Sequence, residues 1–123
     1  MKILIIEDEE VLAKVLEDKL REAKFDVAIV RDGDQALPLA KRYQPDLVLL
    51  DIILPNVDGI EILKDLKLDQ ELKLVPVVIL SNLDDDQRIK EALQLGAVDY
   101  LVKTQHPIEE VVEKVNEYAL KAK

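Results

Sequence analysis

The chain has no cysteine and only one histidine among its 123 residues. Without cysteine there is no disulfide framework, no thiolate metal site and no cysteine nucleophile. His106 has no second histidine with which to share a metal ion, so we expect an exposed loop residue rather than a ligand or a phosphodonor. Any metal site in this protein is therefore expected to use oxygen ligands.

Basic residues and long apolar runs are also scarce. The chain has 17 basic and 26 acidic residues, a net charge of −9, which argues against non-specific binding to DNA or to an anionic membrane. No stretch approaches the ~20 apolar residues of a membrane span. The N-terminal apolar run is too short for a signal peptide, because the chain turns acidic at Glu7. We therefore expect a cytoplasmic protein that binds neither nucleic acid nor membrane.

A chain of this length is expected to form one domain over residues 1–123 and to bury roughly two thirds of its unfolded surface. Five short apolar runs, bounded by turn-forming or charged residues, are typical of strands buried on both faces. They cover residues 3–6, 25–30, 47–50, 75–80 and 98–102. A helical pattern follows each run, which predicts an α/β fold with a parallel sheet and helices on both faces. Doubly wound (βα)5 folds of the flavodoxin-like type have the strand order 2-1-3-4-5, which makes the first and third strands neighbours.

The helical patterns carry three narrower predictions. In the first helix, the apolar residues of one stripe are expected on one packing face: Val11, Leu12, Val15, Leu16 and Leu20. In the fourth, over residues 84–95, Leu93 is expected to point inward. Pro38 lies in the second pattern, and beyond a first turn it removes a helical hydrogen bond, so that helix is expected to kink or to start late.

Polar residues stand at the carboxyl ends of four predicted strands: Glu7 and Asp8, Asp51, Ser81 and Lys103. Open parallel sheets bind ligands just outside these ends. If the first and third strands are neighbours, three carboxylates converge, and their repulsion must be relieved by a proton or a cation. An oxygen-only cluster favours Mg²⁺ over Zn²⁺. We therefore predict a magnesium site at this edge of the sheet.

Asp51 is the carboxylate best placed to act as a nucleophile and to form an aspartyl phosphate. Lys103 and the Ser81 hydroxyl can meet the remaining phosphoryl oxygens and stabilise charge that develops during transfer. Taken singly, Asp51 is more often a turn or capping residue and Lys103 a solvated surface lysine. Their occurrence together at successive strand ends favours a metal and phosphate site.

These motifs resemble the receiver domain of two-component response regulators, the family that includes the single-domain chemotaxis regulator. The resemblance spans the whole chain and rests on separated features in the expected order. They are the acidic pair Glu7-Asp8, Asp51 with Pro55 and Gly59, Ser81, and the segment from Gly96 through Tyr100 to Lys103. The resemblance implies that Mg²⁺ is held by Asp8, Asp51 and the main-chain carbonyl of Ile53, with Glu7 acting largely through water.

The resemblance also implies a phosphorylation switch. Ser81 would be drawn toward the phosphoryl group on Asp51, Tyr100 would turn inward, and the face made by the fourth helix, fifth strand and fifth helix would be remodelled. The phosphodonor would be a sensor histidine kinase or a histidine phosphotransfer protein, and the output a downstream protein partner. The last helix carries four glutamates and no arginine, so we expect a monomer or a weak phosphorylation-dependent dimer.

Three residues beside the predicted site are expected to control how long the phosphoryl group lasts. Asn82 stands where the family usually has a small residue, and its side chain could narrow access to Asp51 or offer an extra donor to the phosphoryl group. Ile53 and Leu83 flank the expected path of an attacking water, and two apolar side chains there should exclude it. We therefore predict a longer-lived phosphoprotein than in receivers with polar residues at both positions.

Two alternative functions remain open at the level of sequence. The first is a phosphorylation-independent scaffold or protein-interaction module with the receiver fold, whose binding would be unaffected by Asp51→Ala. The second is a Mg²⁺-dependent phosphohydrolase, which ranks low because Ile53 stands where such enzymes have a second aspartate. We expect no enzymatic activity beyond the chain's own phosphoryl transfer and dephosphorylation.

Overall fold

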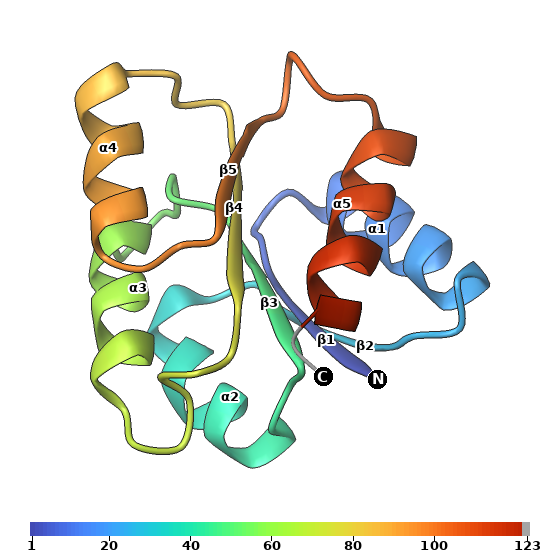
Figure 1. Ribbon diagram of the computed structural model, residues 1–123, viewed down its shortest axis with the longest axis horizontal. Coiled ribbons are helices and arrows are strands. Elements are labelled where there is room, and N and C mark those ends of the chain that lie inside the picture. The colour runs from blue at the N-terminus through green and yellow to red at the C-terminus, as the bar shows by residue number, and fades with distance from the viewer. Residues whose placement is uncertain (122–123) are drawn as a thin grey trace.

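The computed structural model describes residues 1–121, and within them five parallel strands form one sheet in the order β2-β1-β3-β4-β5. The strands are β1 (Lys2–Ile6), β2 (Asp26–Val30), β3 (Leu47–Leu50), β4 (Val77–Ser81) and β5 (Asp99–Val102). The helices are α1 (Glu10–Glu22), α2 (Ala36–Tyr43), preceded by the 3₁₀ turn η1 (Gly33–Gln35), α3 (Gly59–Leu68), α4 (Asp86–Gln94) and α5 (Ile108–Lys121). The predicted α/β fold and strand order are confirmed (Figure 1). In this described range no helix is long and apolar enough to cross a membrane.

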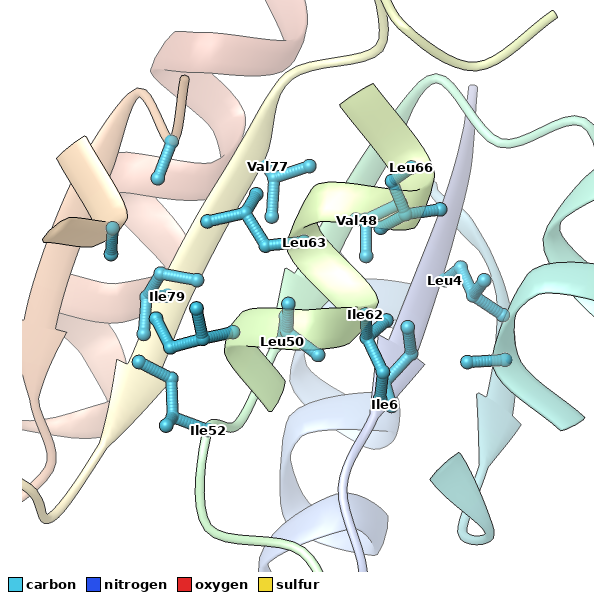
Figure 2. Close-up of a cluster of buried hydrophobic side chains, with 14 of the residues drawn as sticks. Leu4, Ile6, Val48, Leu50, Ile52, Ile62, Leu63, Leu66, Val77 and Ile79 are labelled. Carbon is cyan, nitrogen blue, oxygen red and sulfur yellow. The ribbon is translucent and has the colours of Figure 1, made fainter. Parts of the chain in front are cut away.

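Helices cover both faces of the sheet. Figure 1 shows α1 and α5 on one face and α2, α3 and α4 on the other. Successive strand residues point to opposite faces, so Ile3 and Ile5 join the core beneath α1 and α5, whereas Leu4 joins the core on the other side. Figure 2 shows this second core, where side chains of α3 such as Leu63 lie over those of β3 and β4. Burial on both faces explains why the strands are uninterrupted apolar runs.

Main-chain pairing brings the carboxyl ends of the strands to one edge. Ile6 of β1 is paired with Leu50 of β3. One residue further along, the Asp51 N–H donates to the Ile6 carbonyl at 3.0 Å, and the Lys103 N–H donates to the Ser81 carbonyl at 2.9 Å. The predicted convergence of these strand ends is therefore built into the hydrogen bonding of the sheet.

Some boundaries differ from the sequence-based expectation. β4 begins at Val77 rather than at residue 75. α4 begins at Asp86 rather than at residue 84, because the Asp85 carboxylate accepts a hydrogen bond from the Gln87 N–H (2.8 Å) and caps the helix. α2 begins at Ala36, the first residue of its predicted apolar stripe, rather than late, so Pro38 is its third residue, where a missing N–H removes no helical hydrogen bond.

Three large apolar side chains predicted to pack inward are instead exposed. Val11 and Val15 of α1 are 78% and 37% exposed and Leu93 of α4 is 44% exposed, whereas Leu16 and Ala92 are buried. Leu93 follows Ala92 and so lies about 100° around the helix from it, and Val11 is about 140° from Leu16. Val11 and Leu93 therefore lie outside the arc of their helix that the sheet covers, and the sequence pattern assigned them wrongly to the packing face.

Candidate functional site

Asp51 lies directly after β3 and is almost fully buried, with 4% of its surface exposed. Its Oδ2 accepts a hydrogen bond from the Lys103 Nζ at 3.0 Å, and its Oδ1 accepts one from the Ile53 N–H at 3.1 Å. Lys103, which follows β5, also lies 2.9 Å from the Glu7 Oε1. The lysine therefore connects residues that follow β1 and β3, and both oxygens of Asp51 have a hydrogen-bond partner.

Three carboxylates gather around this point. Glu7, Asp8 and Asp51 each offer an oxygen, and these oxygens lie within 4.8 Å of one another. Glu7 and Asp51 are buried and Asp8 is half-buried. One lysine ammonium cannot neutralise three carboxylates, and an oxygen-only donor set suits a hard cation. The residues present therefore fit Mg²⁺ in charge and in ligand type.

Burial and crowding of charge shift the ionisation of the cluster. Burial raises the pKa of Glu7 to about 7, while the hydrogen bond from Lys103 opposes this rise and the charge of Asp51 adds to it. Burial acts to lower the pKa of Lys103, but its hydrogen bonds to Glu7 and Asp51 outweigh burial and raise that pKa. Lys103 is thus cationic at neutral pH, and the excess negative charge remains for a proton or a metal ion to balance.

The turn after β3 is closed by main-chain contacts. The Gly59 N–H donates to the Ile52 carbonyl at 2.9 Å, and Ile53 and Asp58 form an isolated antiparallel bridge. A Cβ on Gly59 would lie 2.5 Å from the Asp51 carbonyl oxygen and would overlap the Cα of Ile52. Glycine at this position therefore allows α3 to begin close against the backbone of Asp51.

The two predicted switch residues meet at the backbone of Leu83. Ser81 is fully buried, and its Oγ accepts a hydrogen bond from the Leu83 N–H at 3.3 Å. The Tyr100 hydroxyl donates to the Leu83 carbonyl. Tyr100 already lies inward in this structure, and burial raises the pKa of its phenol. Ser81 and Tyr100 thus hold the two polar main-chain groups of one residue, just before α4.

A pocket of about 200 Å³ opens over Asp51. It is lined by Asp8, Glu9, Asp51, Ile53, Asn82 and Lys103. Of the three residues predicted to control access, Ile53 and Asn82 line the pocket, whereas Leu83 packs against the core beneath α3 and α4. Sequence reasoning did not single out Glu9, whose Oε1 lies 3.4 Å from the Lys103 Nζ. Its position beside the acidic pair was the signal available.

Comparisons with known proteins agree with this architecture. The chain is 38% identical over 108 residues to the alkaline phosphatase synthesis transcriptional regulatory protein PhoP of Bacillus subtilis, a match that covers 88% of this chain and 44% of PhoP. It is 39% identical over 114 residues to the DNA-binding response regulator MtrA of Mycobacterium tuberculosis, covering 93% of this chain and 48% of MtrA. The chain therefore spans about half the length of these curated relatives.

A solved structure and a family model also match this chain. The BeF3-activated N-terminal receiver domain of Klebsiella pneumoniae RstA superposes with a TM-score of 0.86 at 33% sequence identity, over 97% of this chain and 98% of that one. The family model described as response regulator receiver domain matches residues 3–116. Since this match takes in most of α5 and all of the sheet except Lys2, the chain belongs to the receiver domains of two-component response regulators.

Proposed function

We propose that the chain accepts a phosphoryl group on Asp51, with Mg²⁺ required, from a sensor histidine kinase or a histidine phosphotransfer protein. The observation that carries the proposal is the buried Asp51 carboxylate, ion-paired to Lys103 within a cluster of three carboxylates. The RstA receiver domain, which is similar in sequence and fold, was solved in a BeF3-activated form, and this supports the proposal. The output is proposed to be a downstream protein partner that binds the face formed by α4, β5 and α5.

In the proposed transfer, the Asp51 carboxylate attacks the phosphorus atom of a phosphohistidine donor. A phosphorus–oxygen bond forms, the phosphorus–nitrogen bond breaks, and its electron pair stays on the donor imidazole. Lys103 Nζ lies 3.0 Å from Asp51 Oδ2, where it can pair with a phosphoryl oxygen, and the Ile53 N–H holds the other carboxylate oxygen. When bound by Asp8, Asp51 and the Ile53 carbonyl, with Glu7 acting through water, Mg²⁺ would supply positive charge that neutralises phosphoryl oxygens.

The proposed signal leaves the site through Leu83. Ser81 holds the Leu83 N–H and Tyr100 holds the Leu83 carbonyl. A phosphoryl group on Asp51 that draws the Ser81 hydroxyl toward itself would release the Leu83 N–H and change the equilibrium position of the segment that leads into α4. The switch is therefore a population shift in which Ser81 and Tyr100 act on the same residue.

Intact-mass measurement after incubation with acetyl phosphate and Mg²⁺ tests the acceptor. We expect the mass of one phosphoryl group to be added, and we expect its addition to be lost when EDTA removes Mg²⁺ or when Asp51→Asn removes the nucleophile. Asp65→Asn, at an exposed aspartate of α3, is the matched control and should be labelled like the parent. Equal labelling of Asp51→Asn and the parent would contradict the proposal.

Partner capture separates the switch from the scaffold alternative. The chain is used as bait with and without beryllofluoride, which mimics the phosphoryl group. A partner that is retained only with beryllofluoride, and that Asp51→Asn loses, supports the switch. Identical retention in all three conditions supports a phosphorylation-independent scaffold.

A further inference from the structure

An ion pair outside the acidic cluster joins the loop after Asp51 to α4. Arg88 is the third residue of α4, and its Nη2 donates to both carboxylate oxygens of Asp58, at 2.9 and 2.8 Å. Asp58 stands 30 positions earlier, directly before α3. A guanidinium that contacts both oxygens of a carboxylate forms charge-assisted hydrogen bonds of restricted geometry. The pair therefore ties the start of α4 to the start of α3.

Asp58 in turn is tied to the residues beside Asp51. Its Oδ1 also accepts a hydrogen bond from the Ile60 N–H at 2.9 Å, so its side chain caps α3. Its backbone is bridged to Ile53, and the Ile53 N–H donates to the Asp51 Oδ1 at 3.1 Å. Contacts thus run without a gap from Arg88 through Asp58 and Ile53 to Asp51.

The surroundings of the pair hold it in place without making it a major source of stability. The Arg88 and Asp58 side chains are 33% and 41% exposed, so solvent screens their attraction. Arg88 Nη1 also lies 3.4 Å from Glu91 Oε1 one turn along α4, which orients the guanidinium. Burial acts to raise the pKa of Asp58, but hydrogen bonds from Arg88 and the Ile60 N–H lower it overall, so Asp58 stays charged at neutral pH.

We propose that Arg88 is a positioning residue for the Asp51 loop: by holding Asp58 it fixes Ile53 beside Asp51 and couples occupancy of the site to the position of α4. The inference rests on the proposed function, because it assigns Mg²⁺ and a phosphoryl group to that site. Coupling between two sites is reciprocal in free energy. If Mg²⁺ binding favours one position of α4 through this contact, the contact must in turn strengthen Mg²⁺ binding by the same free energy.

Metal affinity and amide exchange in matched variants test the positioning role. Arg88→Met removes the guanidinium and keeps an aliphatic chain, and Lys90→Met removes one charge from an exposed position of the same helix. Electron spin resonance of free Mn²⁺, which stands in for Mg²⁺, measures the affinity. We expect about 10-fold weaker binding in Arg88→Met, the smaller end of the loss caused by removing an outer-shell partner, and parent affinity in Lys90→Met. Without metal, the amide hydrogen of Ile53 should exchange with solvent faster in Arg88→Met than in the parent or in Lys90→Met.

Chemical shifts report the coupling itself, which a loss of stability alone would not alter. In the parent, Mg²⁺ should shift amide resonances of both residues 52–59 and residues 86–94, whereas in Arg88→Met the shifts of residues 86–94 should be lost and those of residues 52–59 should remain. Arg88→Lys, which keeps the charge but not the planar guanidinium, should restore part of the effect on α4. Parent affinity in Arg88→Met, or parent shifts of α4 in that variant, would overturn the inference.

Asp58→Asn weakens the same contact from its other side and keeps a side-chain oxygen that can cap α3. Because Arg88 and Asp58 act through one contact, the double variant should lose no more affinity than the worse single variant. Additive losses would overturn the inference. If the parent binds no Mn²⁺, both the proposed function and the inference are overturned. If the parent and Arg88→Met bind Mn²⁺ equally, only the inference is overturned.

Discussion

Ile53 combines three contacts that bear on the chemistry of Asp51. Its N–H holds the Asp51 Oδ1, its backbone is bridged to Asp58, and its side chain, 53% exposed, lines the mouth of the pocket over Asp51. An isoleucine side chain offers no hydrogen bond to orient a water molecule. Leu83, by contrast, packs against the core and does not line that pocket. The proposed control of water access therefore rests chiefly on Ile53.

Replacing Ile53 by asparagine should shorten the life of the phosphoprotein. An amide that orients the attacking water adds about one hydrogen bond, roughly 0.5–1.5 kcal/mol, and so speeds hydrolysis by up to about 10-fold. Decay is followed by intact mass after the small-molecule phosphodonor is removed. Leu83→Glu is the comparison, and it should change decay less, because residue 83 lies outside the pocket. Faster decay in the parent than in both variants would refute the access hypothesis.

Single residues were predictable where local sequence marks a strand end. Asp51 and Lys103 each follow an apolar run, and their ion pair at 3.0 Å joins residues 52 positions apart. The pairing of Arg88 with Asp58 has no such signal, because a surface arginine and a capping aspartate in separate elements carry no periodic pattern. Contacts of this second kind depend on where the fold places α3 and α4.

At the scale of elements, α5 is joined to β5 by a partly buried polar contact. The Tyr118 hydroxyl of α5 donates to the Asp99 Oδ2 at 2.7 Å, and the Asp99 Oδ1 accepts from the Tyr100 N–H at 2.8 Å. Asp99 is the first residue of β5. The contact therefore fixes α5 against the strand that carries Tyr100, within the face proposed to bind a partner.

This contact predicts a distinctive pH dependence. The hydrogen bond to Asp99, followed by burial, raises the pKa of Tyr118 from 10.0 to about 12. Because the folded-state pKa is raised, the contact stabilises the fold fully below pH 10.0, and this stabilisation is lost as the pH rises through about 12. In a tyrosinate absorbance titration, Tyr118 should be the last of the three phenols to ionise.

Two variants check the assignment of that titration. Tyr118→Phe should remove the step of highest pH, and Asp99→Asn should move it to lower pH because the charged acceptor is lost. A step near pH 12 that persists in Tyr118→Phe would show that another phenol is responsible.

Elements differ in how far their sequences predict them. The strands of the sheet were predictable because burial on both faces leaves continuous apolar runs such as residues 47–50. Helix faces were less so: Val11 and Leu93 are apolar and were assigned to the packing face, yet both are exposed. Periodicity gives the direction of the packing face, whereas its width depends on how closely each helix approaches the sheet.

For the whole molecule, the unbalanced negative charge at the carboxyl edge of the sheet predicts stabilisation by Mg²⁺. A cation that binds the folded chain and not the unfolded chain adds about 2.7 kcal/mol to the free energy of unfolding at 100 times its Kd. Thermal unfolding should therefore shift upward with MgCl₂. NaCl of equal ionic strength should have a smaller effect, because it only screens the repulsion.

Asp8→Asn identifies the site of this stabilisation. Asp8 is half-buried and offers one of the three clustered oxygens, so the variant should fold and should lose most of the Mg²⁺-specific shift. Asp26→Asn, at an exposed aspartate that begins the edge strand β2, is the control and should keep the shift. Equal Mg²⁺-specific shifts in Asp8→Asn and the parent would contradict a metal site at the acidic cluster.

The sequence alone determined the class of fold, the strand ends and the residue types at those ends, because buried parallel strands and their exits leave local patterns in the chain. Only the tertiary structure decided that Lys103 lies between Glu7 and Asp51, that Ser81 and Tyr100 meet at Leu83, and which helix faces are covered. Apart from the local hydrogen bond between Ser81 and Leu83, these contacts join residues that are far apart in sequence. Their distances depend on the register of the sheet and on helix packing, which no local pattern encodes.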